Sequence, residues 1–142
     1  MKTIDEIISR TDYINLNSAL KNRCIKIARI IRSKMEDLDI DEISVNGRKY
    51  NIVKRHTYSG FSTEYLAVHC YIDYEEWDLS LEQTSFEYYT GDFHCAINPA
   101  TSKLFLEFLN NAKAIFEQLD EIETSSVNAI NEAMAATKDL VE

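Results

Sequence analysis

The hydrophobic positions of the chain change their period twice, and these changes divide the chain into three parts. In the first and last parts, apolar side chains recur every three or four residues, which is the spacing of one face of an α-helix. In the middle part, apolar and polar residues alternate, as they do in strands with one buried face. The pattern predicts an α+β fold in which residues 1–38 are helical, 42–98 form an antiparallel sheet and 99–141 are helical again.

The N-terminal part predicts two helices. Thr3 and Glu6 have the spacing of a capping box, and the isoleucines behind them indicate a short helix over about residues 4–10. A long helix over about residues 13–38 is indicated by an apolar stripe that neither Gly nor Pro interrupts. The stripe consists of Leu16, Leu20, Cys24, Ile27, Ile31, Met35 and Leu38.

The middle part predicts a five-stranded antiparallel meander. Asn46-Gly47 is a strong signal for a two-residue hairpin turn, which pairs Val45 with Arg48 and Ile43 with Tyr50. This register places Ile43, Val45, Tyr50 and Ile52 on one buried face. Further strands are predicted over about residues 63–73, 84–89 and 93–98, the last two joined by a turn at Gly91-Asp92.

The C-terminal part is predicted to be helical after Asn98-Pro99, a cap residue followed by Pro at the first helical position. From Phe105 to Leu140 the core positions follow an unbroken spacing of three and four, as in a coiled-coil seam. The segment "ETSSVN" (123–128) leaves two alternatives open, one long helix or two shorter ones. The seam predicts a homodimer, and the whole chain, 1–142, is predicted to form a single domain.

Charge is distributed unevenly along the chain, whose net charge is −9. Residues 21–34 carry six bases and no acid, whereas residues 56–102 carry eight acids and no Lys or Arg. Because an acidic protein repels phosphate, direct binding of nucleic acid is not expected, and the basic segment is predicted to lie against the acidic parts of the chain. The sequence has no long apolar run, so neither a membrane span nor a signal peptide is predicted. Its three cysteines are spaced unlike a disulfide framework, and a cytoplasmic location is therefore expected.

Two stretches, "AVHCYID" (67–73) and "DFHCAIN" (92–98), each contain a His-Cys pair. Successive side chains of a strand point to opposite faces of the sheet, so each imidazole lies on the face opposite its neighbouring thiol. His69, Cys70, His94 and Cys95 therefore cannot surround one ion. We predict no metal site and no cofactor.

Two surfaces emerge as candidate binding sites. The first is an acidic loop around a tryptophan, predicted to bind a protein partner, with residues Asp73, Glu75, Glu76, Trp77 and Asp78. The second is the outer face of the sheet, a weaker candidate for binding a ligand, with residues Tyr65, His69, Tyr71, Glu87, Tyr89 and His94.

The leading hypothesis is a non-catalytic acidic cytoplasmic protein that binds another protein. Inhibitors, immunity proteins and chaperone-like factors share this size and charge. In one version of the hypothesis, the acidic surface of the protein mimics the charge of nucleic acid. The first alternative is a small-ligand module that binds a nucleotide or a metal on the Tyr/His face. The second is a small hydrolase that uses His69, His94 and Glu87.

Overall fold

The structure, a computed structural model, describes residues 3–9, 11–56, 60, 62–72, 74–81, 99 and 102–141. It confirms the α+β prediction: helices at the N-terminal end, an antiparallel sheet, and a long C-terminal helix. The elements in chain order are α1 (Ile4–Ser9), α2 (Thr11–Asp37), β1 (Glu42–Val45), β2 (Arg48–His56), β3 (Ser62–Ile72), β4 (Glu75–Ser80), α3 (Ser102–Thr137) and a 3₁₀ turn at Lys138–Leu140.

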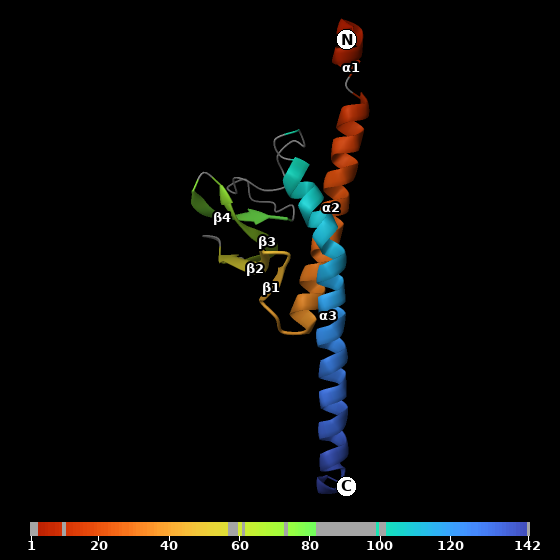
Figure 1. The fold of residues 1–142 in the computed structure, drawn as a ribbon, viewed down its shortest axis with the longest axis vertical. Helices are drawn as coiled ribbons and strands as arrows, with labels where there is room; N and C mark the ends of the chain where they lie inside the picture. The colour runs from red at the N-terminus through yellow and green to blue at the C-terminus, as the bar shows by residue number, and fades with distance from the viewer. Residues whose placement is uncertain are drawn as a thin grey trace.

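The two long helices lie side by side and run in the same direction, but they are displaced along their common axis (Figure 1). The N-terminal part of α2 extends beyond the start of α3, and the C-terminal part of α3 extends beyond the end of α2, so that the two chain ends lie at opposite ends of the molecule. The sheet packs on one side of the region where the helices overlap. Lys34 of α2 and Asp120 of α3 form an ion pair at 3.9 Å near the end of that overlap.

Both N-terminal helices form where the hydrophobic spacing predicts them. The backbone amide of Glu6 donates to Thr3 Oγ1 at 3.3 Å, which is one arm of the predicted capping box. At the other end of α2, Asp39 adopts a φ of 54°, and the amide of Ile40 donates to the carbonyl of Met35 at 2.9 Å. This left-handed residue and its backbone hydrogen bond end α2 and turn the chain toward β1.

The sheet follows the predicted order of a meander through its four described strands, β1-β2-β3-β4. Asn46 and Gly47 both have positive φ, 50° and 78°, as a type I′ hairpin turn requires. The predicted pairs of Ile43 with Tyr50 and of Val45 with Arg48 are confirmed. A one-residue slip would have moved every apolar side chain of this hairpin to the other face of the sheet.

The fourth strand of the described sheet, β4, differs from the predicted fourth strand over 84–89. The acidic segment that we predicted as a loop forms β4, which pairs with β3 so that Cys70 lies opposite Trp77 and Ile72 opposite Glu75. The alternation of Trp77, Leu79 and Leu81 with polar residues was the signal for a strand, and the density of acids obscured it. The predicted strands 84–89 and 93–98 lie outside the described residues.

α3 is one continuous helix, so the first of the two alternatives for the C-terminal part is the correct one. It begins at Ser102, whereas Pro99, predicted at the first helical position, lies in a turn. Proline suits turn positions as well as the first turn of a helix, so its presence alone does not locate the helix start.

The core lies between the sheet and the overlapping halves of α2 and α3. The predicted stripe of α2 contributes Cys24, Ile31 and Met35, and Ala28 of the same helix is buried beside them. The predicted buried face of the hairpin is confirmed, with Ile52 partly buried at its margin. The remaining buried members of the core are Ile43, Val45, Tyr50, Leu66, Val68, Leu81, Phe105, Phe108, Ile115 and Leu119.

Candidate functional site

The environment of α3 changes halfway along its length. Phe105, Ile115 and Leu119 are at most 1% exposed, whereas Ile130 is 60% and Met134 67% exposed. We call residues 122–141 the C-terminal arm; it comprises the last turns of α3 and the 3₁₀ turn that follows. The arm carries an apolar surface that no described part of the chain covers.

The change occurs where α2 ends. A small hollow marks this point, and it is lined by Lys34, Asp37, Leu38, Leu119 and Glu123. Beyond it, a second, open hollow lies on α3 itself, lined by Glu121, Ile122, Ser125, Ser126 and Ala129. The small side chains of this second hollow allow a neighbouring helix to approach the backbone of the arm closely.

The exposed apolar residues of the arm continue the helical face that is buried in the first half of α3. Leu119, Ser126, Ile130 and Thr137 are separated by seven, four and seven residues, and residues at these spacings lie on one side of a helix. Val127 and Met134 flank this line, and both are exposed. The arm therefore presents a helical packing surface outside the core of its own chain.

The hydroxyl groups within this surface already have acceptors. Ser126 Oγ donates to the carbonyl of Ile122 at 2.7 Å, and Thr137 Oγ1 donates to the carbonyl of Ala133 at 2.8 Å. A buried donor without an acceptor costs about 1–3 kcal/mol. Because both donors are satisfied within the helix, another protein chain can cover this surface without that penalty.

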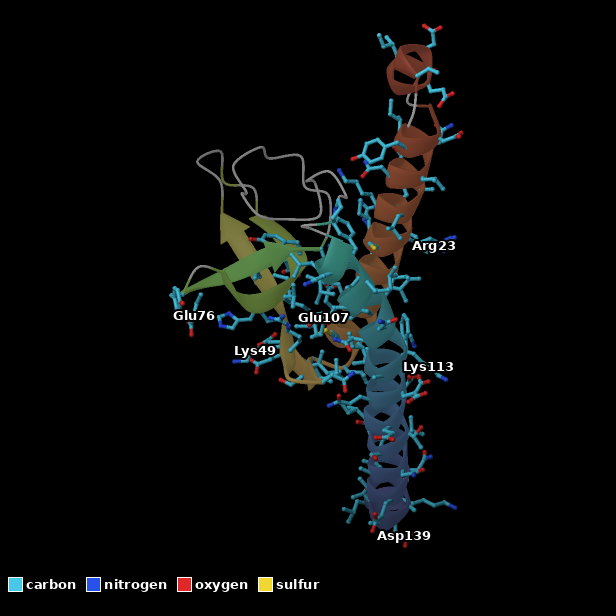
Figure 2. The ribbon with its side chains drawn as sticks, turned by 45° about the horizontal axis from the view of Figure 1, so that its top comes forward. Arg23, Lys49, Glu76, Glu107, Lys113 and Asp139 are labelled. Carbon is cyan, nitrogen blue, oxygen red and sulfur yellow. The ribbon has the colours of Figure 1, made fainter. Side chains whose placement is uncertain are left out.

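The charges of the arm are placed mostly away from the apolar surface. Glu132 and Asp139 are each two residues removed from positions on the apolar line, and therefore point to other sides of the helix. Figure 2 shows Asp139 near the free end of the helix. Glu123 and Lys138 lie one turn before Val127 and one turn after Met134, so they border the apolar surface at its two ends.

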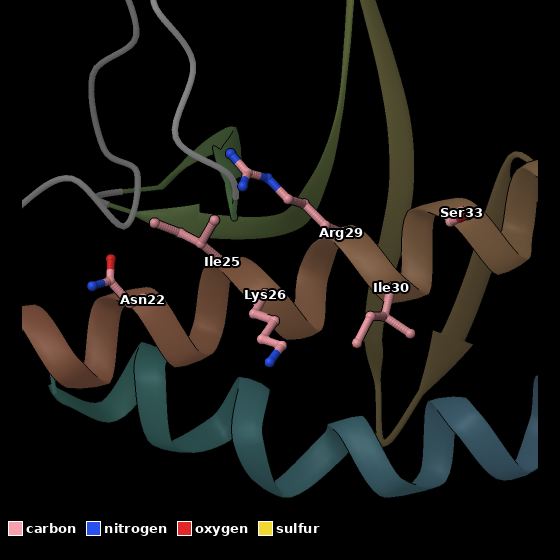
Figure 3. Close-up of a pocket in the computed structure, with 6 residues that line it drawn as sticks. All are labelled: Asn22, Ile25, Lys26, Arg29, Ile30 and Ser33. Carbon is pink, nitrogen blue, oxygen red and sulfur yellow. The ribbon is translucent and has the colours of Figure 1, made fainter.

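A second exposed helical face lies on α2, where a hollow is lined by Asn22, Ile25, Lys26, Arg29, Ile30 and Ser33 (Figure 3). Within the described part of the chain, neither Lys26 nor Arg29 pairs with a carboxylate. The neighbouring bases do: Arg32 lies 3.6 Å from Glu36 and donates to the carbonyl of Glu64 at 2.9 Å. Arg32 thus attaches α2 to β3 through a backbone carbonyl, and Lys34 pairs with Asp120 of α3.

A polar cluster that the sequence analysis missed joins the hairpin to the first half of α3. Asn111, which is 4% exposed, accepts a hydrogen bond from Asn46 Nδ2 at 2.7 Å and donates to Tyr50 Oη at 2.9 Å. Beside it, Arg48 Nε and Nη2 donate to the two carboxylate oxygens of Glu107, the second at 3.3 Å. Figure 2 shows Glu107 between α3 and the sheet. No local spacing links these residues, because they are about 60 positions apart in the chain.

Burial raises the pKa of Tyr50, and the hydrogen bond from Asn111 opposes this shift. The phenol therefore stays neutral at physiological pH and serves as an acceptor within the cluster. This arrangement fixes the hairpin on α3.

The predicted acidic site is only partly described. The segment Glu75–Asp78 lies on β4, the Glu76 side chain is exposed, and His69 Nε2 lies 3.7 Å from Glu76 Oε1. Figure 2 shows Glu76 at the side of the sheet away from the helices. The side chains of Glu75, Trp77 and Asp78 and the whole of Asp73 lie outside the described structure, so their grouping into a binding site remains a prediction.

The predicted Tyr/His face is covered in part. Tyr65 is 2% exposed and Ala67 is fully buried, while His69 is half-buried. The structure describes only the backbone of Tyr71, and Glu87, Tyr89 and His94 lie outside the described residues. Among the groups whose positions are described, no three His, Cys, Asp or Glu side chains come together as a metal site would require.

No protein-family model matches the chain, and none of the curated proteins or solved structures matches it. Within its described residues, no helix is both long enough and apolar enough to cross a membrane.

Proposed function

We propose that this chain is a non-catalytic protein whose role is to bind another protein, and that the C-terminal arm is its binding surface. The observation that carries the proposal is the exposure of Val127, Ile130 and Met134 on one side of the arm, in continuation of a core face. Three large apolar side chains on one helical face commonly anchor a helix to a partner. The partner supplies the surface that α2 supplies in the first half of α3.

The partner is a protein, as the composition predicts, but it binds the arm and not the acidic segment. The net charge of −9 then acts on solubility and on the choice of partner, while the apolar line provides the binding energy. The homodimer predicted from the seam is one form of this proposal. The first half of the seam, from Phe105 to Leu119, is buried in the core of its own chain. Of this seam, only the part on the arm is therefore available to a second chain.

Site-specific photo-crosslinking in the native host tests the proposal. A photoreactive amino acid at Ile130 is expected to form a covalent adduct with a protein, whereas one at Asn128 is not. Asn128 is a matched control, because it is also exposed but lies on the other side of the same helical turn. Absence of any protein adduct at Ile130, or equal yields at the two positions, would rule out the arm as the binding surface.

A further inference from the structure

We infer that the partner of the C-terminal arm is the arm of a second copy of the chain, packed antiparallel about a two-fold axis near Ile130. This inference rests on the proposed function, since it names the occupant of the surface proposed there. The observation behind it is the order of side chains along the arm. When a second arm runs in the opposite direction, each side chain of the contact surface meets one of complementary size or charge.

The apolar side chains fit this reversal. If the two-fold axis passes between Ile130 and Asn131, the two Ile130 side chains lie within one residue of each other along the helix axis, and Val127 on one helix comes opposite Met134 on the other. A medium side chain then faces a long, adaptable one, as close helix packing favours. Ser126, Ala129 and Ala133 are small, so the two backbones can approach closely along one edge of the contact.

The charges at the ends of the apolar surface fit the same arrangement. One helical turn beyond the Val127–Met134 contact, Glu123 of one arm comes opposite Lys138 of the other, and the two-fold axis produces this pair twice. A parallel arrangement would instead place Glu123 opposite Glu123 and Lys138 opposite Lys138. The opposite charges therefore select the antiparallel arrangement, since like charges in contact repel.

The stagger of the helices leaves room for the second copy. The arm projects past the end of α2 (Figure 1), and its α-helical part from Ile122 to Thr137 is about 24 Å long at 1.5 Å per residue. An antiparallel contact of this length keeps the two sheets at opposite ends of the dimer. A contact between two short helical segments is small, so we expect a dissociation constant in the range of roughly micromolar.

Size-exclusion chromatography with light scattering tests the inference on the purified full chain. We expect a mass twice the chain mass of 16.4 kDa, falling toward the chain mass on dilution. Ile130→Glu places two carboxylates at the axis and is expected to raise the dissociation constant about a hundredfold, since it also removes the central apolar contact. Asn128→Glu adds the same charge on the other side of the helix and is expected to leave the mass unchanged.

A charge exchange tests the direction of packing. Glu123→Lys and Lys138→Glu are each expected to weaken the dimer about fivefold, because each replaces two attractive pairs by repulsive ones. The double variant restores the pairs in reversed order and is expected to return to within about twofold of the original constant. Circular dichroism confirms that each variant keeps its helix content. A double variant no tighter than the weaker single variant would overturn the antiparallel arrangement.

The two experiments distinguish failure of the dimer from failure of the proposed function. A chain that stays at 16.4 kDa up to about 0.2 mM would overturn the dimer, since that range covers micromolar contacts. If Ile130 still formed an adduct with another protein in the host, the proposed function would stand with a different partner. A monomeric chain without any adduct would overturn both.

Discussion

At the scale of single residues, the fold depends on a few polar groups placed among apolar ones. Asn111 is the buried polar residue of the described core, and it joins Asn46 in the hairpin turn to Tyr50 in β2. Its amide satisfies both neighbours at once, which specifies where the hairpin docks on α3. The Asn46-Gly47 turn was predictable because its chemistry is local, whereas this long-range cluster was not.

Asn111→Ala is expected to lower the free energy of unfolding by about 2 kcal/mol, because it leaves the Asn46 amide and the Tyr50 hydroxyl without their buried partner. Urea unfolding followed by circular dichroism measures the change. Asn110→Ala, at an exposed neighbouring position of the same helix, is the control and is expected to change stability by less than about 0.5 kcal/mol. Equal effects of the two substitutions would show that the cluster does not stabilise the docking.

Cys24 gives stability a dependence on pH. Burial raises the pKa of its thiol from 9.0 to about 11, so above pH 9 the unfolded chain loses a proton that the folded chain keeps. The folded state then binds more protons, and the free energy of unfolding falls as the pH rises from 9 toward 11. Below pH 9 this contribution is fully present and constant.

Cys24→Ala is therefore expected to reduce the slope of stability against pH between pH 9 and 10. Chemical unfolding at several pH values measures the slope, which is insensitive to the constant packing loss that the smaller side chain causes. A variant with the slope of the original chain would show that Cys24 does not titrate differently in the two states.

At the scale of elements, α3 shows what hydrophobic spacing can and cannot predict. The steps of three and four from Phe105 to Leu140 permitted one helix or two, and the structure has one α-helix from Ser102 to Thr137, followed by the 3₁₀ turn. The spacing could not show that the first half of α3 is buried in its own chain while the arm is exposed. The change between the two occurs where α2 ends, and the placement of α2 against α3 depends on tertiary packing. For β4 the alternation was present, but the acids, Glu76 and Asp78 among them, favoured the prediction of a loop.

Deleting residues 125–142 is expected to leave the stability of the remaining fold nearly unchanged. No described residue of this segment belongs to the core cluster or is a hydrophobic side chain packed against it, so the urea midpoint of the truncated chain should match that of the full chain in dilute solution. The helical signal per molecule should fall, because the deleted residues are largely helical. A large drop in the midpoint would mean that the arm supports the fold of its own chain.

At the scale of the whole molecule, the stagger of two parallel helices produces an elongated shape with the chain ends far apart (Figure 1). A compact chain of this length has a radius of gyration of about 14 Å. X-ray scattering in dilute solution is expected to give a clearly larger value, since α3 alone is about 54 Å long at 1.5 Å per residue. A value near 14 Å would show that the arm folds back on the chain.

The central claim is that the first half of α3 packs against its own chain and that the second half packs against a partner. Hydrogen exchange of the purified chain, measured by mass spectrometry at high and low concentration, tests this most directly. We expect peptides from residues 105–119 to be protected at both concentrations and peptides from 124–137 to be protected only at the high one. Equal, strong protection of both halves in the dilute protein would contradict the account.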